Sequence, residues 1–225
     1  MKKYLVLFAL ILIQGCSSGG GDSTAPIVPD TVFQLFEAGS FTDGFKETWN
    51  VTGTDTAGGV WSGVFDEEVQ AEVTYDSQPA MPILTLVQLT ESSSNGKIDN
   101  LNVDFWSTSA SDRRFLGSND LISGTMTVSA TTAAIPETAK IGDSGAVGTY
   151  LDSAGSVEVI SWRLDDGGNG QAKVVQLVTE KDQAGILVSS STTTTLIDTS
   201  GNAISKTLEI YTADTGVTLT LFLNK

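Results

Sequence analysis

The sequence predicts an all-β protein built as an antiparallel meander, and three observations support this. From residue 31 onward, short apolar or alternating runs are separated by clusters of Gly, Asn, Asp and Ser, a pattern typical of antiparallel strands joined by tight turns. Several of these clusters hold residues that tolerate a positive φ. No segment repeats apolar residues at i, i+3 and i+4 over the length of a helix, so the class is all-β.

The apolar runs give the expected strands. In the first half they are Thr31–Phe36, Phe45–Gly53, Gly59–Phe65, Val69–Tyr75, Ile83–Leu89, Ile98–Trp106 and Gly124–Ala130. In the second half they are Gly145–Leu151, Val157–Leu164, Lys173–Glu180, Gly185–Ile197, Ile204–Thr212 and Val217–Leu223. The last run alternates most clearly, since Val217 and Leu219 fall on one face and Thr218 and Thr220 on the other.

The turns between these runs favour sequential hairpins. Turn-forming clusters lie at residues 95–96, 165–170, 200–202 and 214–216, and each joins two successive strands. A long meander must protect its edge strands, which it does by closing into a barrel or half-barrel or by packing as a sandwich; we favour a barrel or half-barrel. The sequence allows a subdivision of the β domain, residues 31–225, near 130–141, and at most one short helix near Ser109–Asn119.

The N-terminus has the features of a secretion signal. Lys2 and Lys3 precede an uninterrupted apolar run from Tyr4 to Ile13. This run is well short of the roughly 20 residues that a membrane-spanning helix requires. We therefore expect a signal peptide at residues 1–15, followed by a flexible Ser/Gly-rich tether at 16–30 that spans on the order of 20 Å.

The end of this segment, Ile13, Gln14, Gly15 and Cys16, resembles the lipobox of bacterial lipoproteins. Ile stands where Leu is commoner, and Gln14 is larger than the usual small residue. The resemblance implies cleavage after Gly15, a thioether lipid on Cys16 and acylation of the new amine by a fatty acid such as palmitate. Ser17, in place of Asp, implies sorting to the outer membrane of a Gram-negative cell. The partner would then be the membrane itself, held by acyl chains that contribute about 0.8 kcal/mol per buried methylene.

The charge of the expected mature protein is strongly negative. Without Lys2 and Lys3, 10 of the 12 basic residues remain against 27 acidic ones, so the formal net charge is −17. Such a surface repels phosphate backbones and anionic headgroups. This argues against a nucleic-acid partner and leaves membrane attachment to the lipid.

The absence of histidine excludes several chemistries. The chain has no His and a single Cys, so His-based acid–base catalysis and His-containing metal sites are excluded. The string Gly142-Asp143-Ser144-Gly145 resembles the sequence around the nucleophile of trypsin-like proteases. That chemistry needs a His to deprotonate the hydroxyl, so we interpret the string as a turn.

Acidic residues offer two further candidates. The neighbours in Glu67-Glu68 and in Asp165-Asp166 would point to opposite faces of a strand, which works against a shared glycosidase cleft. Asp165, Asp166 and Asn169 crowd one Gly-rich turn and are weak calcium candidates. The twelfth position of a calcium loop counted from Asp165 is Gln176, where a Glu is required. We expect a plain turn, no metal and no cofactor.

Aromatic residues are the remaining candidates for ligand binding. Four tryptophans lie in or beside the expected strands: Trp49, Trp61, Trp106 and Trp162. They either line a cavity or groove for a lipid or sugar or fill a β core, and we favour the core. Arg113-Arg114 is the only adjacent basic pair of the mature protein; it either marks a contact site or pairs with surplus acid, which we favour.

These observations predict a lipid-anchored envelope lipoprotein that acts as a non-catalytic binding or structural module. Its further partner would be an envelope protein or an apolar small molecule. Two alternatives stay open: a carrier of a lipid or other apolar ligand in a β half-barrel, and a carboxylate-dependent glycan hydrolase.

Overall fold

The structure is a computed structural model that describes residues 30–94 and 96–225. The expected signal peptide, most of the tether and the lipidation residue Cys16 lie outside the described residues.

Strands make up most of the described chain, with one short 3-10 helix, η1. The elements of the first half are β1 (Val32–Gln34), β2 (Lys46–Asp55), β3 (Val60–Val69), β4 (Val73–Tyr75), β5 (Gln78–Glu91), β6 (Lys97–Ser107), η1 (Ala110–Asp112) and β7 (Phe115–Asp120). Those of the second half are β8 (Met126–Thr132), β9 (Thr138–Lys140), β10 (Ser144–Asp152), β11 (Val157–Gly168), β12 (Gln171–Lys181), β13 (Leu187–Ile197), β14 (Ala203–Thr212) and β15 (Val217–Asn224).

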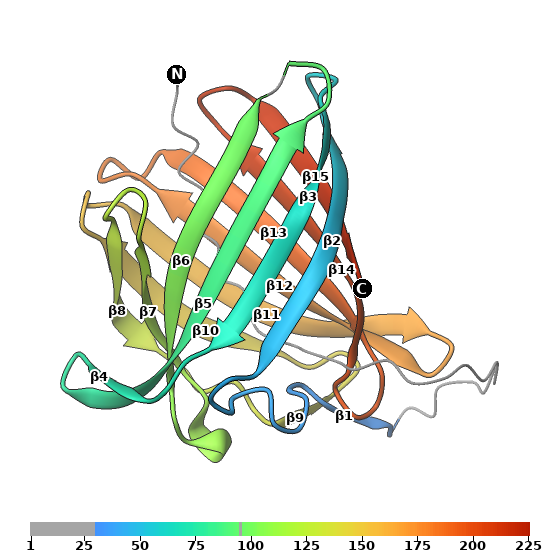
Figure 1. Ribbon diagram of the computed structural model, residues 1–225. Helices are drawn as coiled ribbons and strands as arrows, with labels where there is room; N and C mark the ends of the chain where they lie inside the picture. Colours follow the sequence, from blue (N-terminus) through green and yellow to red (C-terminus); the bar gives the residue numbers. More distant parts are fainter. Residues whose placement is uncertain (1–29, 95) are drawn as a thin grey trace.

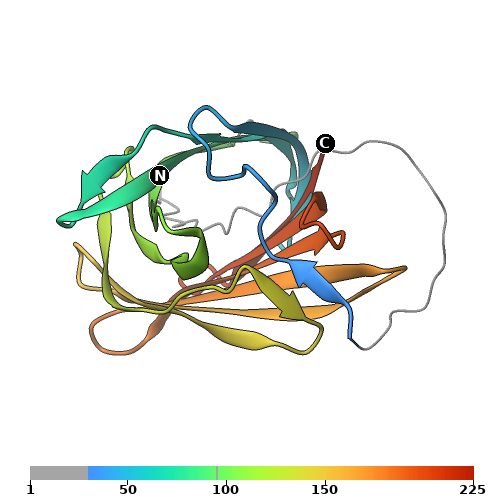
Figure 2. The ribbon, with the colours of Figure 1, turned by 90° about the horizontal axis from the view of Figure 1, so that it is seen from below.

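These strands form a closed antiparallel barrel (Figures 1 and 2). The sheet runs β3-β2-β15-β14-β13-β12-β11-β10-β8-β7-β6-β5-β4, and an additional pairing between β3 and β5 closes the ring. Twelve of the thirteen strands form the ring, because β4 pairs only with β5. The all-β prediction and its favoured barrel architecture are confirmed, and the meander is complete because β15 returns to pair with β2.

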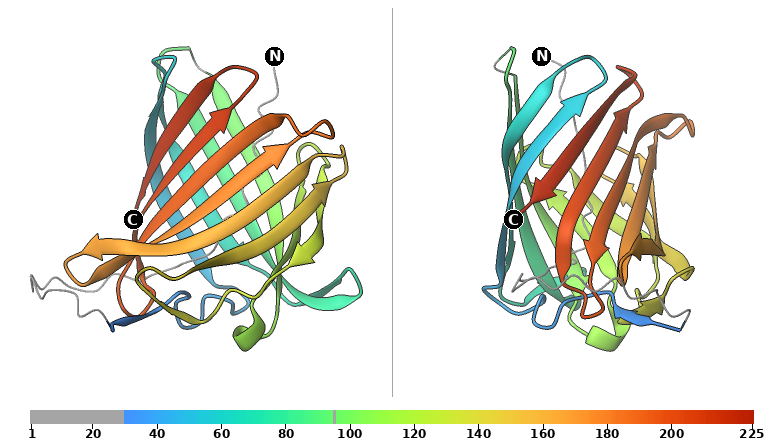
Figure 3. Two further views of the ribbon diagram at one scale, coloured as in Figure 1. Left: turned by 180° about the vertical axis from the view of Figure 1, so that it is seen from behind. Right: turned by 90° about the vertical axis from the view of Figure 1, so that its right-hand side faces the viewer.

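The barrel has two different ends. Strands β10 to β13 run steeply inclined to β2 to β6 on the opposite wall, as the back view in Figure 3 shows. The β2–β3 and β5–β6 turns lie at the upper end in Figure 1. At the lower end, β1 and β9 form a separate two-stranded ribbon, and the chain between β1 and β2 crosses the opening (Figure 2).

One of the expected strands was wrong. The run Val69–Tyr75 is not one strand, because β3 ends at Val69 and β4 begins at Val73. The short helix expected near Ser109–Asn119 is present as η1, but the strand β7, which begins at Phe115, was not expected. In β7, buried and exposed residues hardly alternate, because both faces of the strand are buried. On the outside of the barrel, Leu116 packs against Tyr75 and Ala80.

The Gly-rich turn at 165–170 is also smaller than expected. β11 continues through Gly168, so Asp165 and Asp166 lie in a strand. Only Asn169 and Gly170 form the hairpin turn, and both have positive φ values, 53° and 78°, as a two-residue type I′ turn requires. The segment 130–141 contains the end of β8 and the short strand β9, and β8 and β10 on either side of it pair directly with each other in the ring.

The inward-facing residues form two apolar clusters. The upper cluster includes Trp49, Trp61, Phe65, Val87 and Leu89. The lower cluster includes Trp106 and Trp162 from the wall, together with residues of the segments that cover the lower end, such as Phe33, Leu35 and Ile135.

A row of buried polar side chains separates the two clusters on one wall of the barrel. It passes through directly paired residues of β2, β3, β5, β6 and β7, namely Glu47, Glu67, Thr85, Asn102 and Asp120. From the opposite direction, the fully buried Lys206 of β14 donates to Glu67 over 2.9 Å and lies 4.0 Å from Glu47. Because β14 and β3 are not neighbours in the sheet, this ion pair joins separate parts of the wall across the interior.

Candidate functional site: a polar pocket at the lower end of the barrel

A pocket of about 350 Å³ lies where the chain between β1 and β2 meets η1 and the segment before β9. Its walls come from three parts of the sequence: residues 34–42, the loop that carries Ala110 and Arg113, and Glu137. This volume falls at the lower end of the range for small-molecule sites.

The first wall is held in place by backbone hydrogen bonds. The Leu35 amide donates to the Glu137 carbonyl over 2.8 Å. This hydrogen bond joins the start of the segment 34–42 to the residue just before β9. Successive turns follow, in which the Ser40 amide donates to the Glu37 carbonyl and the Thr42 amide donates to the Gly39 carbonyl. Gly39 has a φ of 86°, a conformation that favours glycine. The tight turns expose Glu37 and Phe41 to the pocket and bury the Ser40 hydroxyl.

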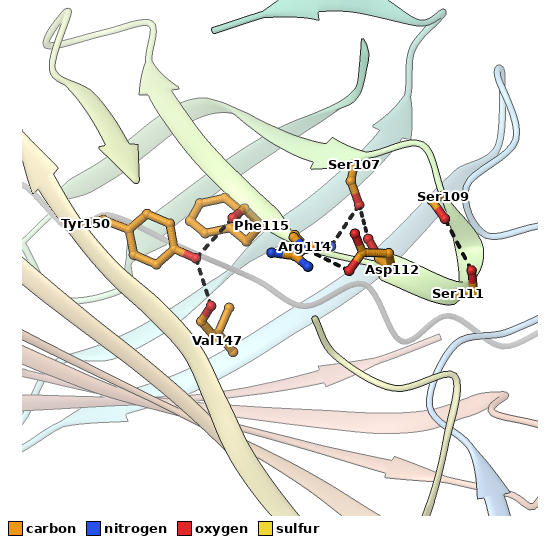
Figure 4. A network of polar contacts seen from close by, with 8 residues as sticks. All are labelled: Ser107, Ser109, Ser111, Asp112, Arg114, Phe115, Val147 and Tyr150. Carbon is orange, nitrogen blue, oxygen red and sulfur yellow. Dashed lines mark hydrogen bonds and ion pairs between the residues drawn. The ribbon is translucent and has the colours of Figure 1, made fainter. Parts of the chain in front are cut away.

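The second wall is the β6–β7 connection, which a network of polar contacts fixes (Figure 4). The Ser107 hydroxyl donates to the Asp112 carbonyl over 2.5 Å and accepts from the Arg114 amide over 2.9 Å. The Arg114 guanidinium pairs with the Asp112 carboxylate at 2.7 Å. On the barrel side, the Tyr150 hydroxyl lies 3.1 Å from the Phe115 carbonyl. Arg113 is therefore held between anchored neighbours.

Arg113 is the central charged group of the pocket. Only 6% of its surface is exposed, and its guanidinium carbon lies 3.5 Å from the centre of the Phe41 ring, which is a cation–π contact. One terminal nitrogen donates to the Ser107 carbonyl over 2.8 Å. Burial lowers the pKa of Arg113 to about 10, and the charge of Glu137 opposes this shift, so the side chain is charged at neutral pH.

Among residues 30–94 and 96–225, two buried hydrogen-bond donors in the pocket wall find no partner. They are the Nε of Arg113 and the hydroxyl of Ser40, whose residue is 1% exposed. An unpaired buried donor costs free energy, so such a group in a native structure calls for an explanation, for example a bound water or ion. Both residues line the pocket, so each brings a hydrogen-bond donor to its wall.

Aromatic rings continue from the pocket into the barrel. Phe36 lies 5.5 Å from Phe41, which lies 5.9 Å from Trp106. Trp106 lies 5.3 Å from Phe115. The ring contacts are edge-on or tilted, as aromatic pairs prefer. The pocket therefore has a rigid apolar wall beside its charged groups.

The four tryptophans do not form one site. All of them are buried: Trp49 and Trp61 belong to the upper cluster, and Trp106 and Trp162 to the lower one. The indole nitrogen of Trp49 donates to Glu47 and that of Trp61 to Asp55. Of the four, Trp106 comes nearest to the pocket, behind Phe41.

The acidic candidates also separate. Asp165 pairs with Arg163 at 2.8 Å, whereas Asp166 accepts the Gly168 amide and Asn169 occupies the turn. Within residues 30–94 and 96–225, no three Asp, Glu, His or Cys side chains gather in a group that could hold a metal ion. Glu67 faces the interior, whereas Glu68 pairs with Lys46 at 2.7 Å on the outer face. Both residues line one pocket of about 280 Å³, but the side chain of Glu67 is fully buried.

A second, apolar pocket lies at the upper end. It measures about 50 Å³ and is lined by residues such as Trp61, Ile98 and Leu219. This volume is well below the range for small-molecule sites.

Comparison with known proteins finds no relative: no family model, no curated protein and no solved structure matches the chain. In the portion of the chain that the structure describes, no helix has the length and hydrophobicity to cross a lipid bilayer.

The sequence analysis predicted the environment of Arg114 but not that of Arg113. Arg114 pairs with the nearby Asp112, as we favoured. Arg113 instead enters the pocket with Glu37, Ser40 and Glu137. The only local signal was a basic pair beside an aromatic residue, since the other residues belong to no motif and meet Arg113 only in the folded barrel.

Proposed function

We propose that this protein is a lipid-anchored envelope protein whose barrel binds a small polar molecule at its lower end, without catalysing a reaction. The observation that carries the binding role is the pair of unpartnered polar atoms, on Arg113 and Ser40, in the wall of a 350 Å³ pocket. The anchoring rests on the lipobox resemblance at Cys16. In this proposal the lipid places the barrel at the outer membrane.

The polar interior supports a polar ligand over an apolar one. The barrel interior also buries the hydroxyls of Ser118 and Thr127, a directly paired couple on β7 and β8, and within the described residues neither hydroxyl has a hydrogen-bond partner. Hydrocarbon cannot satisfy such groups, and leaving them unpaired is costly. A carrier of a lipid is therefore less well supported than a polar-ligand protein.

The hydrolase alternative gains little support. Glu37 and Glu137 do share the pocket, but a glycan-binding cleft would place an exposed Trp beside such a pair. All four tryptophans are buried.

Blocking the pocket is expected to abolish ligand retention. Ala110 lines the pocket from η1 and is exposed, so Ala110→Trp fills the site without disturbing the core. The full chain is purified from its native envelope in mild detergent, and its mass is measured by native mass spectrometry. We expect a one-to-one small-molecule adduct on the wild type and none on the variant.

The matched control is Thr54→Trp, which adds the same side chain to the exposed outer face of β2. This variant is expected to keep the adduct. A wild type without any adduct, or an Ala110→Trp protein that keeps it, would contradict the binding proposal.

Replacing Cys16 is expected to release the protein from the membrane. Cells that express the full chain are labelled with radioactive palmitate and fractionated. The wild type and a Ser17→Ala control should carry the label in the membrane fraction, and Cys16→Ser should lose both the label and the membrane association, because no acyl chain is attached. A labelled Cys16→Ser protein would disprove the anchor.

A further inference from the structure

The charges around the pocket identify the ligand more closely. Arg113 contributes one positive charge, and Glu37 and Glu137 contribute two negative charges. A ligand with only a carboxylate would be attracted by Arg113 but repelled by two carboxylates. A ligand with only an ammonium group would be attracted by the two carboxylates but repelled by Arg113. A molecule that carries both charges close together satisfies both walls.

The hydrogen-bonding groups divide in the same way. The Nε–H of Arg113 and the hydroxyl of Ser40 are buried and unpartnered, and both donate to carboxylate oxygens. Glu37 and Glu137 can only accept when ionised, so they suit an ammonium group. The rest of the lining includes the polar residues Gln34 and Thr42. It also includes Phe36, Phe41 and Ala110, which offer apolar contact to a side chain.

We infer that the pocket binds a free α-amino acid, with the carboxylate on Arg113 and Ser40, the ammonium group toward Glu37 and Glu137, and an apolar side chain against Phe36 and Phe41. This inference rests on the proposed function, because it names the ligand class of the same pocket. The size agrees, since the volume lies at the lower end of the range for ligand sites.

Calorimetric titration of the full chain tests the inference. The twenty protein amino acids are titrated singly, and the tightest binder is compared with its decarboxylated amine and its deaminated acid; for leucine these are 3-methylbutylamine and 4-methylpentanoate. We expect one-to-one binding of an amino acid with an apolar side chain, and at least tenfold weaker binding of both analogues.

Two variants assign the charges. Glu137 is exposed, so Glu137→Gln leaves the packing intact. This variant should bind the amino acid about tenfold more weakly, and it should bind the deaminated acid with unchanged or higher affinity. Arg113→Gln should lower the affinity for the amino acid and for the deaminated acid, but not the affinity for the amine. Since Arg113 is buried, Ser40→Ala serves as a second test of the carboxylate side, with a smaller effect in the same direction.

The outcomes separate the inference from the function on which it rests. If a neutral molecule such as a sugar binds, and Ala110→Trp abolishes that binding, the proposed function stands and the amino-acid inference is overturned. Equal affinity for the amino acid and its deaminated analogue also overturns the inference. If nothing binds, both fall.

Discussion

Replacing Lys206 with methionine is expected to lower the free energy of unfolding by about 3–5 kcal/mol, the usual cost of removing one partner from a buried ion pair. The Lys206 side chain is fully buried, as is that of Glu67, and the pair measures 2.9 Å. The ammonium group also lies 4.8 Å from the centre of the Trp49 ring. Without it, the buried Glu67 carboxylate loses the cation that lies 2.9 Å away. Chemical denaturation of the wild type and variant gives the difference.

An exposed ion pair of similar geometry provides the control. Lys46 and Glu68 lie 2.7 Å apart on the outer face, with 65% and 34% of their side chains exposed. Lys46→Met should cost at most about 1 kcal/mol, because water screens the pair. The double variant Lys206→Met/Glu67→Leu should recover part of the lost stability, since it removes both buried charges. Equal effects of Lys206→Met and Lys46→Met would contradict this account of the interior.

Glu158 is expected to make the protein less stable as the pH rises from 4.5 to 8. Both of its carboxylate oxygens are buried, and neither has a hydrogen-bond partner in the part of the chain that the structure describes. Burial, reinforced by the nearby charges of Glu180 and Asp152, raises its pKa from 4.5 to about 8. Between these values the folded state holds a proton that the unfolded state has released. Stability therefore falls with pH, by about 1.4 kcal/mol per unit, and the contribution is fully present only below pH 4.5.

Glu158→Gln is expected to remove this slope, because the amide is neutral at every pH. Denaturation curves at pH 5, 6, 7 and 8 measure the free energy of unfolding of both proteins. The variant's stability relative to the wild type should rise by about 3 kcal/mol from pH 5 to pH 7. Glu209→Gln, at an exposed position, is the control and should leave the slope unchanged. A constant difference between Glu158→Gln and the wild type would show that Glu158 is not held neutral.

The strands were predictable because their signal is local. In β2, buried and exposed residues alternate almost without exception, and the sequence shows that alternation directly. The hairpin at Asn169 and Gly170 also follows from residue type. The exceptions have tertiary causes: β7 is buried on both faces by the excursion of the chain through β4, so its sequence lacks the pattern of a half-buried strand.

The pocket was not predictable from the sequence, because it depends on how the barrel closes. Ser40, Arg113 and Glu137 are brought together only when the chain between β1 and β2 crosses the lower opening. Likewise, Lys206 and Glu67 are 139 positions apart in the chain. Nothing in their local sequence indicates that a lysine so placed would be fully buried. Both sites form only when the ring closes through the pairing of β3 with β5.

An experimental electron-density map of the full chain, isolated from its native envelope without denaturation, tests the central claim most directly. We predict density for one small molecule in the pocket at the lower end, within hydrogen-bonding distance of the Arg113 Nε and the Ser40 hydroxyl. Ordered water alone against those two atoms would contradict the claim that this pocket is a ligand site.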